Sequence, residues 1–387
     1  MRRIDQYAGF FLCHMLSILY KVKGKSRVDQ PIPDSLSKVL VIKFLGFGSI
    51  IMTTPLLAEM KKNYPECEIH FLTFSENVPI CESISLIDKT LYLEKSSSWK
   101  FVFSLVKNFR LIRKRNYDAV LNLEFFSNFT LILSALSKAG IVLCFGGRHE
   151  YSKRLCHRII SYENSTHVTY KFRNFLKIIE IESFQENRPL VRLEESSHAK
   201  KKISELLERH RVQTGKDLLI IVNINSSEMS DIRKWPIENY QQIISFLLSK
   251  QNVKILLIGG KEDVSYVSQL DKRVLGDKER IINLAGQISL KELISLMKMS
   301  YLYIGNDSGP LHLAEACSLP NVSFFGPESP DAYGHPGDKN YIFYSGLPCS
   351  PCLNVYKNKD TSCLDNKCLK KIEPAEVIKV LQEKYFS

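Results

Sequence analysis

Apolar runs alternate along the chain with segments of helical periodicity. Residues 38–44 are almost all apolar, as in a strand buried within a parallel sheet, and residues 50–64 follow with apolar positions at helical spacing. The pattern recurs up to residue 138 and predicts strands at 68–74, 88–93 and 117–123 and helices at 99–115 and 127–138. Such alternation predicts a parallel, doubly wound sheet with helices on both faces.

A second alternation begins at residue 217, after helical patterns at 170–180 and 197–212. It predicts strands at 218–224, 253–258 and 321–325 and helices at 237–250 and 263–275. We therefore expect two Rossmann-like halves with a cleft between them. In such sheets ligands bind beyond the carboxyl ends of the strands, so the loops at those ends are where site residues are sought.

One of these loops lies in the segment 301–316, where an apolar run stops at Gly305 and a helical pattern begins at Pro310. Proline suits the start of a helix, and Ser308 or Gly309 can precede it as the N-cap. The free N–H groups at a helix start attract anions such as phosphate. Asp307 would repel phosphate but can accept hydrogen bonds from sugar hydroxyls, so the loop indicates a sugar phosphate or sugar nucleotide. Alternatively, the turn has this composition for its geometry alone.

Two further loops carry candidate ligand groups. Ser226 and Ser227 follow the strand at 218–224, and Lys234 stands shortly before a proline-started helix. Hydroxyls and a cation in that place could hold a pyrophosphate, although an exposed lysine is also common without a ligand. Glu262 follows the strand at 253–258 and could bind ribose hydroxyls. An acidic residue there is equally favoured by the dipole of the next helix.

Composition and charge narrow the class of partner. A chain of 387 residues with 44% hydrophobic residues is long enough for two or three domains. Lys and Arg total 53 against 41 Asp and Glu, a net charge of +12 that favours anionic partners such as nucleotides, phosphorylated glycans or acidic lipid. Zinc-finger spacing, an aromatic RNP-type run and a long basic block are all missing from the sequence. We therefore expect no nucleic-acid module.

The N-terminal 37 residues form an extension whose most apolar part is 7–20, too short for a transmembrane helix. A signal peptide is not favoured because no small-residue cleavage site follows. Helical spacing gives two apolar stripes, which are Ile4, Tyr7, Phe11, Met15, Ile18 and Val22, and Phe10, Cys13, Leu16 and Tyr20. With basic residues on both flanks, this predicts either an interfacial helix on an anionic membrane or a helix packed on the protein itself. Residues 29–37 contain two prolines and read as a linker.

Four cysteines near the C-terminus, Cys349, Cys352, Cys363 and Cys368, lie in a loop with little apolar sequence. Four thiolates at this spacing can hold one structural zinc or iron ion. Disulfides are the alternative, which a reducing cytosol disfavours. The other cysteines, including Cys144, Cys156 and Cys317, read as small buried hydrophobic residues. A final helix is predicted at 373–385.

With these loops placed, the chain resembles the heptosyltransferase family, glycosyltransferase family 9, whose GT-B members add heptose from ADP-heptose to the lipopolysaccharide core. The resemblance covers about residues 38–345. It is carried by VLVIKFLGFGS with Thr53-Thr54-Pro55, by Ser226-Ser227 with Lys234-Trp235-Pro236, and by Asn306-Asp307-Ser308-Gly309-Pro310-Leu311-His312 with Phe325-Gly326-Pro327.

The resemblance implies a GT-B fold of two Rossmann-like domains facing across a cleft. The expected boundaries are an N-terminal extension 1–37, an acceptor domain 38–195, a nucleotide-sugar domain 196–345, a four-Cys loop 346–371 and a C-terminal helix 372–387, which is expected to cross back onto the first domain. For the donor it implies Lys234 at the phosphates, Glu262 at the ribose, Asp307 at the sugar and the backbone of Ser308 and Gly309 at the pyrophosphate. Ser226, Ser227 and His312 complete the expected donor-binding set.

Gly46, Gly48 and Ser49 form the expected acceptor-side loop, and here the chain departs from the family. The family usually has Gly-Asp, with the aspartate as the presumed base, where this chain has Gly48-Ser49. A serine cannot take the acceptor proton at neutral pH, so Glu124, at the end of another strand of that sheet, is the best candidate for the base. The alternative for Glu124 is a helix-start carboxylate. His149, Glu150 and His167 are further candidates in the expected cleft, and a structural role is the alternative for each.

The expected activity is inverting, metal-independent transfer of a sugar, heptose from ADP-heptose, to a lipopolysaccharide-type or other glycan or glycolipid acceptor. Lys234 would stabilise the leaving diphosphate. No catalytic cofactor is expected, and a structural zinc or iron at the four cysteines stays open because some relatives that modify proteins carry a Cys-bound iron. The expected location is cytoplasmic, on the inner-membrane surface. The alternatives are a sugar-nucleotide-binding protein without turnover and a membrane-associated scaffold.

Overall fold

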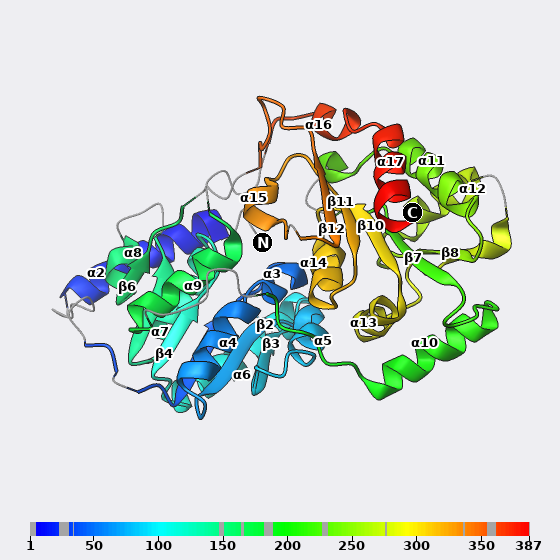
Figure 1. Cartoon of the computed structure of the whole chain (residues 1–387). Helices are drawn as coiled ribbons and strands as arrows, with labels where there is room; N and C mark the ends of the chain where they lie inside the picture. The colour runs from blue at the N-terminus through cyan, green and yellow to red at the C-terminus, as the bar shows by residue number, and fades with distance from the viewer. Residues whose placement is uncertain are drawn as a thin grey trace. The chain divides into compact units, whose positions relative to one another are not determined.

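The computed structural model describes residues 5–22, 31–33, 35–146, 151–163, 166–181, 189–226, 231–274, 277–335, 337–353 and 361–386. Its contacts divide the chain into two compact units, Met1–Val191 and Arg192–Ser387 (Figure 1). Ser227, His149 and Glu150 lie outside the described residues.

The N-terminal unit is built on a six-stranded parallel sheet with the order β3-β2-β1-β4-β5-β6. Its strands are β1 (Lys38–Ile42), β2 (Glu68–Phe74), β3 (Lys89–Leu93), β4 (Ala119–Asn122), β5 (Ile141–Phe145) and β6 (Arg158–Ile160). Its helices are α2 (Phe10–Val22), α3 (Phe47–Ile51), α4 (Thr54–Asn63), α5 (Val78–Cys81), α6 (Ser98–Lys114), α7 (Asn128–Leu136), α8 (Tyr151–Leu155) and α9 (Val168–Ile178). Short turns η1 (Asp5–Gly9), which is π-helical, and η2 (Ser75–Asn77) complete it.

The C-terminal unit repeats this topology, with strand order β12-β11-β10-β7-β8-β9, again all parallel. Its strands are β7 (Leu218–Asn223), β8 (Val253–Leu257), β9 (Ile281–Asn283), β10 (Leu302–Asn306), β11 (Asn321–Phe325) and β12 (Asn340–Tyr344). Its helices are α10 (Ser197–Arg209), α11 (Ile237–Leu248), α12 (Val264–Arg273), α13 (Leu290–Met299), α14 (Gly309–Ala316), α15 (Pro330–Tyr333), α16 (Lys367–Lys370) and α17 (Pro374–Tyr385). The 3-10 turns η3 (Asp231–Arg233) and η4 (Lys278–Arg280) lie in its loops. The predicted pair of doubly wound parallel sheets is confirmed.

The helix predicted at 50–64 is wrong as a single element, because the structure has α3 and α4 with a break at Met52 and Thr53. Pro55 lies in the first turn of α4 and has no N–H to continue a preceding helix. The hydroxyls of Thr53 and Thr54 donate to the carbonyls of Ile50 and Ile51, both at 2.7 Å. These bonds occupy carbonyl groups that the interrupted helix leaves available.

The last helix was expected to cross back onto the first domain, and that expectation is wrong. α17 packs against α11 of its own unit, with Val377 and Leu381 fully buried in the core of the C-terminal sheet. The hydroxyl of Tyr301 donates to the carbonyl of Tyr385, at 2.5 Å. The apolar side of α17 is therefore used within the C-terminal unit.

The N-terminal extension is fixed to the N-terminal unit by the side that carries Cys13 and Ser17, both buried, and α2 packs on α7 and α8. Asp5 accepts hydrogen bonds from the backbone N–H groups of Phe129 (2.6 Å) and Asn128 (3.2 Å), so it caps the start of α7. Burial raises the pKa of Asp5 despite these bonds. Tyr7, Phe11, Met15, Ile18 and Val22 remain exposed. The side of α2 with Cys13 and Ser17 thus packs on the protein, and the stripe that contains Phe11 and Met15 faces outward. No helix in the described part of the chain could cross a membrane by length and hydrophobicity.

Cys144 and Cys156, expected to be small buried hydrophobic residues, are buried but form a disulfide, which joins β5 to the residue after α8. Their Cα atoms are 6.5 Å apart because β5 and the start of β6 lie side by side. Sequence spacing alone did not show that Cys156, just before β6, lies beside Cys144 of β5. Cys317 is free and partly buried.

Candidate functional site

The candidate site in the C-terminal unit lies where β10 and β7 end. β10 leads from Asn306 into Asp307 and Ser308, and α14 begins at Gly309 with Ser308 as its N-cap residue and Pro310 in its first turn. Position 305 requires glycine because neighbouring atoms lie too close for a side chain. A Cβ there would lie 2.6 Å from the Tyr303 hydroxyl and 2.9 Å from the carbonyl oxygen of Asn223. The small residues therefore let two neighbouring strands converge beneath the turn.

Buried asparagines hold this end of the sheet together. Asn306 donates to the carbonyls of Ile224 (3.0 Å) and Asn225 (3.2 Å) and accepts the backbone N–H of Trp235 (2.9 Å). Asn223 donates to the hydroxyl of Ser308 at 3.1 Å. The loop after β7 and the start of α14 are therefore fixed to each other through side-chain amides.

The buried ring of Trp235 fixes the backbone of the turn that carries Arg233 and Lys234. Its ring is fully buried and stacked on Phe324 at 4.1 Å, and its indole N–H donates to the carbonyl of Ile372 at 3.1 Å. Arg233, two residues earlier, is buried and donates from Nη2 to both the carbonyl (2.8 Å) and the carboxylate (2.6 Å) of Asp307. Burial would lower the pKa of Arg233, but the carboxylates of Asp307 and Glu328 raise it. The guanidinium therefore stays charged beside Asp307.

Lys234 was expected at the donor phosphates, which stays a prediction, and the cation that contacts Asp307 is Arg233. The ammonium of Lys234 lies 2.7 Å from the carboxylate of Asp231 and 4.5 Å from the centre of the Tyr266 ring. Adjacent residues in this turn point in different directions, so the sequence could not distinguish them. Arg233 is the residue that sequence reasoning missed, although it stood in the same basic pair.

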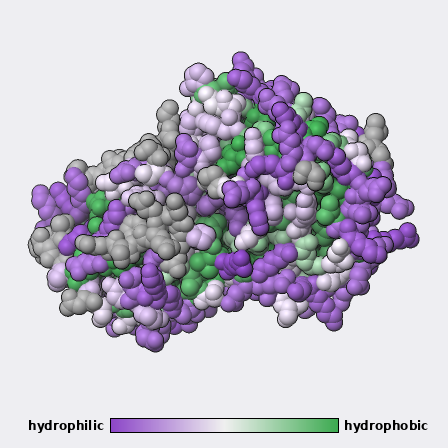
Figure 2. Space-filling view, viewed as in Figure 1, coloured by the Kyte–Doolittle hydropathy of each residue, from purple (hydrophilic) through white to green (hydrophobic). Residues whose placement is uncertain are grey.

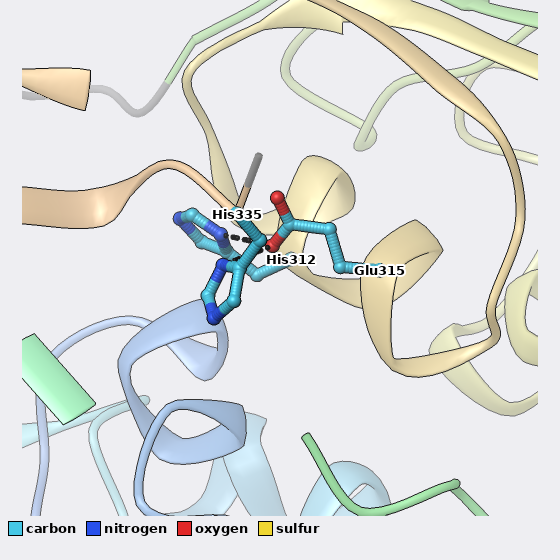
Figure 3. Close-up of side chains that lie close together, drawn as sticks. All are labelled: His312, Glu315 and His335. Atoms are coloured by element: carbon cyan, nitrogen blue, oxygen red, sulfur yellow. Dashed lines mark hydrogen bonds and ion pairs between the residues drawn. The ribbon is translucent and has the colours of Figure 1, made fainter. Parts of the chain in front are cut away.

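Glu315 of α14 is a buried carboxylate beside two imidazoles, that of His312 on the same helix and that of His335 in the loop after α15 (Figure 3). One oxygen of Glu315 lies 3.0 Å from Nδ1 of His312 and 3.0 Å from Nδ1 of His335, while Nε2 of His312 lies 3.8 Å from Asp307. Burial would raise the pKa of Glu315, but His335 and His312 lower it from 4.5 to about 2. Glu315 and His335 were not predicted, and the i, i+3 spacing of His312 and Glu315 was the available signal.

These three side chains are also a set that could hold a metal ion. Their ligand atoms lie within 4.8 Å of one another, and no other such group of three is found in the described residues. The distances of 3.0 Å between nitrogen and oxygen equally fit hydrogen-bonded ion pairs. In that arrangement Glu315 orients His312, whose other nitrogen faces Asp307.

The remaining predicted donor residues lie at the same ends of the strands. Ser226 follows β7 and is half-buried. Glu262 is exposed in the loop after β8, the neighbour of β7, with its carboxylate folded over Gly260. Ser308 is buried and Gly309 opens α14. Because the strands are parallel, the loops that follow them all lie at the carboxyl end of the C-terminal sheet.

In the N-terminal unit, Glu124 is buried where β4 ends and contacts the loop after β1. One oxygen accepts the backbone N–H groups of Phe44 (2.5 Å) and Leu45 (2.8 Å), and the other lies 3.1 Å from the ammonium of buried Lys43. The helix-start alternative is wrong, because Ser127 and Asp5 cap α7. Glu124 holds the predicted acceptor-side loop.

That loop turns sharply into α3. Gly46 has φ +74°, a conformation that favours glycine, and precedes the helix. Gly48 is buried and Ser49 is half-buried in the first turn of α3. His167, another candidate base, caps α9 by accepting the N–H of Thr169 at 3.3 Å, which is a structural role.

The other three C-terminal cysteines lie near Cys368, but the four do not form a metal-binding group in the structure. Burial raises the pKa of Cys368 to about 11, and Cys352, Cys363 and Cys349 are near enough to add to that rise. Their sulfur atoms are not among the described groups of three ligands within 4.8 Å. The predicted metal at this loop stays a prediction.

Comparisons with known proteins agree with this geometry. Residues 105–362 match the family model of glycosyltransferase family 9 (heptosyltransferase). The chain is 25% identical to lipopolysaccharide heptosyltransferase 1 of Campylobacter coli, over 89% of this chain and 98% of that protein. It shares its fold with a glycosyltransferase family 9 protein of Veillonella parvula (TM-score 0.74, 22% identity, 92% and 98% covered). It also shares its fold with E. coli heptosyltransferase WaaC in complex with ADP-2-deoxy-2-fluoro heptose (0.65, 14%, 89% and 99%).

Proposed function

The chain belongs to glycosyltransferase family 9, the heptosyltransferases, and from that premise we propose that it moves heptose from ADP-heptose to a lipopolysaccharide-type glycan acceptor. The observation that supports this most is the buried pair of Arg233 and Asp307 beside the start of α14. A carboxylate for sugar hydroxyls, a cation and free backbone N–H groups are the groups that a diphosphate-linked sugar needs.

The donor would bind as follows. The N–H groups at Ser308 and Gly309 receive the diphosphate, with Ser226 and Lys234 from the loop after β7. Asp307 accepts hydroxyls of the sugar, Glu262 those of the ribose, and His312, oriented by Glu315, donates to the same region. Arg233 and the helix dipole then stabilise the charge that develops on the departing ADP. These charges serve where a metal ion would otherwise be used, so the transfer is proposed to be metal-independent and inverting.

For the acceptor, Glu124 is proposed as the base, with Gly46, Gly48 and Ser49 lining the acceptor side. Its contacts give it a second role, because its carboxylate holds the backbone of Phe44 and Leu45. Glu124→Gln keeps an acceptor oxygen for those N–H groups but replaces the carboxylate with a neutral amide beside the positive charge of buried Lys43. The double variant Lys43→Met/Glu124→Gln removes that charge. If transfer returns in the double variant, Glu124 is a positioning residue and another group takes the proton.

The deciding experiment incubates the protein with ADP-heptose and heptose-deficient lipopolysaccharide and measures released ADP together with the glycosylated product. Release is expected in the presence of EDTA and is expected to fall by more than about a hundredfold in Asp307→Asn, the loss typical of a missing transition-state contact. ADP-heptose binding without any release would instead favour a sugar-nucleotide-binding protein without turnover.

A glycolipid acceptor places the enzyme at a membrane surface, proposed here as the cytoplasmic face of the inner membrane. The exposed stripe of α2 is the part of the N-terminal extension that would lie on it. The four-Cys loop is proposed to bind a structural zinc or iron ion. The scaffold alternative predicts membrane binding with no ADP release from any donor.

A further inference from the structure

A second helix of the N-terminal unit, α6, exposes an apolar stripe. Trp99 is 78% exposed and Phe103 65%, and Val102 and Val106 are exposed beside them. The spacing 99, 102, 103, 106 places the four on one side of the helix, opposite the buried Ser104, Asn108 and Ile112. Large apolar side chains in such a row are uncommon on a surface that contacts only water.

The same helix is strongly basic. Its sequence, SWKFVFSLVKNFRLIRK, contains five cations, Lys100, Lys107, Arg110, Arg113 and Lys114, and no acidic residue. All five are exposed. Such a combination of exposed aromatic residues and unopposed cations complements an apolar layer covered by negative charge.

A groove of about 630 Å³ runs between α6 and β3, the edge strand of the sheet. Its walls include the apolar side chains of Leu91, Tyr92, Trp99 and Phe103. Lys89, Lys100 and Lys107 also line it, against the single carboxylate of Glu94. The groove therefore offers an apolar floor with ammonium groups around it.

The stripe of α6 and that of α2 belong to the same face of the N-terminal sheet. α6, α7 and α2 contribute to one core with the same side of the strands, through Ile112, Leu131 and Cys13. Phe101 of α6 and Phe129 of α7 are 5.9 Å apart, and α2 packs on α7. The view in Figure 2 shows a mostly hydrophilic surface on which hydrophobic residues gather in patches.

We propose that α6 and the groove beside β3 form a second membrane-docking element, which binds the surface of an anionic lipid bilayer together with α2. Trp99 and Phe103 enter the interfacial layer, the cations contact lipid phosphates, and the groove receives part of an acyl chain. The inference rests on the proposed glycolipid acceptor for its purpose, but its test needs no acceptor.

The test uses the full chain and flotation with vesicles of phosphatidylcholine, with and without phosphatidylglycerol. Binding to the anionic vesicles is expected, weakened by salt. Lys100→Gln/Lys107→Gln is expected to weaken it about thirtyfold, at roughly 1 kcal/mol per cation. Trp99→Ser/Phe103→Ser should weaken it by about tenfold or more. The matched controls, Lys201→Gln/Lys272→Gln and Leu364→Ser, change exposed residues of the C-terminal unit and should bind like wild type.

Fluorescence gives an independent readout, because the chain has two tryptophans and Trp235 is fully buried. A blue shift on adding anionic vesicles therefore reports on Trp99. The proposal is overturned if the α6 variants bind vesicles like wild type while Phe11→Ser/Met15→Ser does not. It is also overturned if the shift appears without vesicles as the protein dimerises. ADP binding by the α6 variants should equal that of wild type, which separates this result from a failure of the proposed function.

Discussion

At the scale of single residues, the site depends on which of two neighbouring cations faces Asp307. Arg233 does so because Trp235 is locked by stacking and by its bond to Ile372, which fixes the turn before it. The sequence showed the basic pair and Asp307, and topology placed their loops together. It could not show the direction of each side chain, since that depends on how Trp235 packs in the core.

Arg233→Ala is expected to destabilise the fold by about 3–5 kcal/mol, because it leaves Asp307 buried without its partner. Lys234→Ala breaks a pair with an exposed aspartate and should cost less than about 1 kcal/mol. Urea unfolding of both variants measures this difference. Equal losses would contradict the distinct roles assigned to the two cations.

Glu315 should make stability depend on pH. Its pKa in the folded protein, about 2, lies below the usual 4.5, so the ionised form is favoured by folding. The stabilisation is present above about pH 4.5 and is lost as the pH falls toward 2, with an upper bound of about 3 kcal/mol. Glu315→Gln should therefore be less stable than wild type at pH 6, and the gap should narrow toward pH 3.5. A gap that stays constant with pH would exclude this linkage.

At the scale of elements, most long strands and amphipathic helices were predictable, the edge strand β3 among them, and the shortest strands were not. β6 and β9 have three residues each, too few for a periodic signal. α13 does carry a readable start, the capping box of Ser289 and Glu292, and β5 a five-residue apolar run, yet neither was predicted. The break between α3 and α4 did carry a signal, Pro55, but the helical spacing of apolar residues across 50–64 was read as one continuous helix.

Asp5→Ala should cost about 1–2 kcal/mol, since it removes the acceptor for two N–H groups at the start of α7. It should also loosen η1 and α2, measured as faster amide exchange in residues 5–22 and 128–132. Glu205→Ala, which removes only an exposed pair at 4.0 Å, is the matched control and should change neither. Unchanged exchange in α7 would mean that Asp5 contributes nothing to that helix.

The disulfide between Cys144 and Cys156 can be detected by counting the cysteines that react with an alkylating agent. Alkylation of the denatured, unreduced protein should label eight of the ten cysteines, and reduction beforehand should expose Cys144 and Cys156. Mass spectrometry of the peptides identifies the pair. Ten labelled cysteines without reductant would show that the bond is absent in the isolated protein.

At the scale of the molecule, two sheets of identical strand order follow from the two alternating halves of the sequence. Fold and family were predictable because many weak local patterns agree with one another. For the four-Cys loop, the sequence showed only the spacing of the cysteines. If it binds metal as proposed, elemental analysis should find about one zinc or iron per chain, lost in Cys352→Ser/Cys363→Ser but kept in Cys317→Ser. Equal metal content in the two variants would place the ion elsewhere.

The cap of α7 by Asp5 joins residues 122 and more positions apart, and this has a consequence for synthesis. Asp5 leaves the ribosome long before the helix that it caps, so the emerging N-terminal segment has no partner until residue 129 follows. During that interval its apolar stripes are both uncovered. A nascent chain would therefore be open to capture by a chaperone or a bilayer first, and a shortened chain beginning at Lys38 would carry α7 without its acceptor carboxylate.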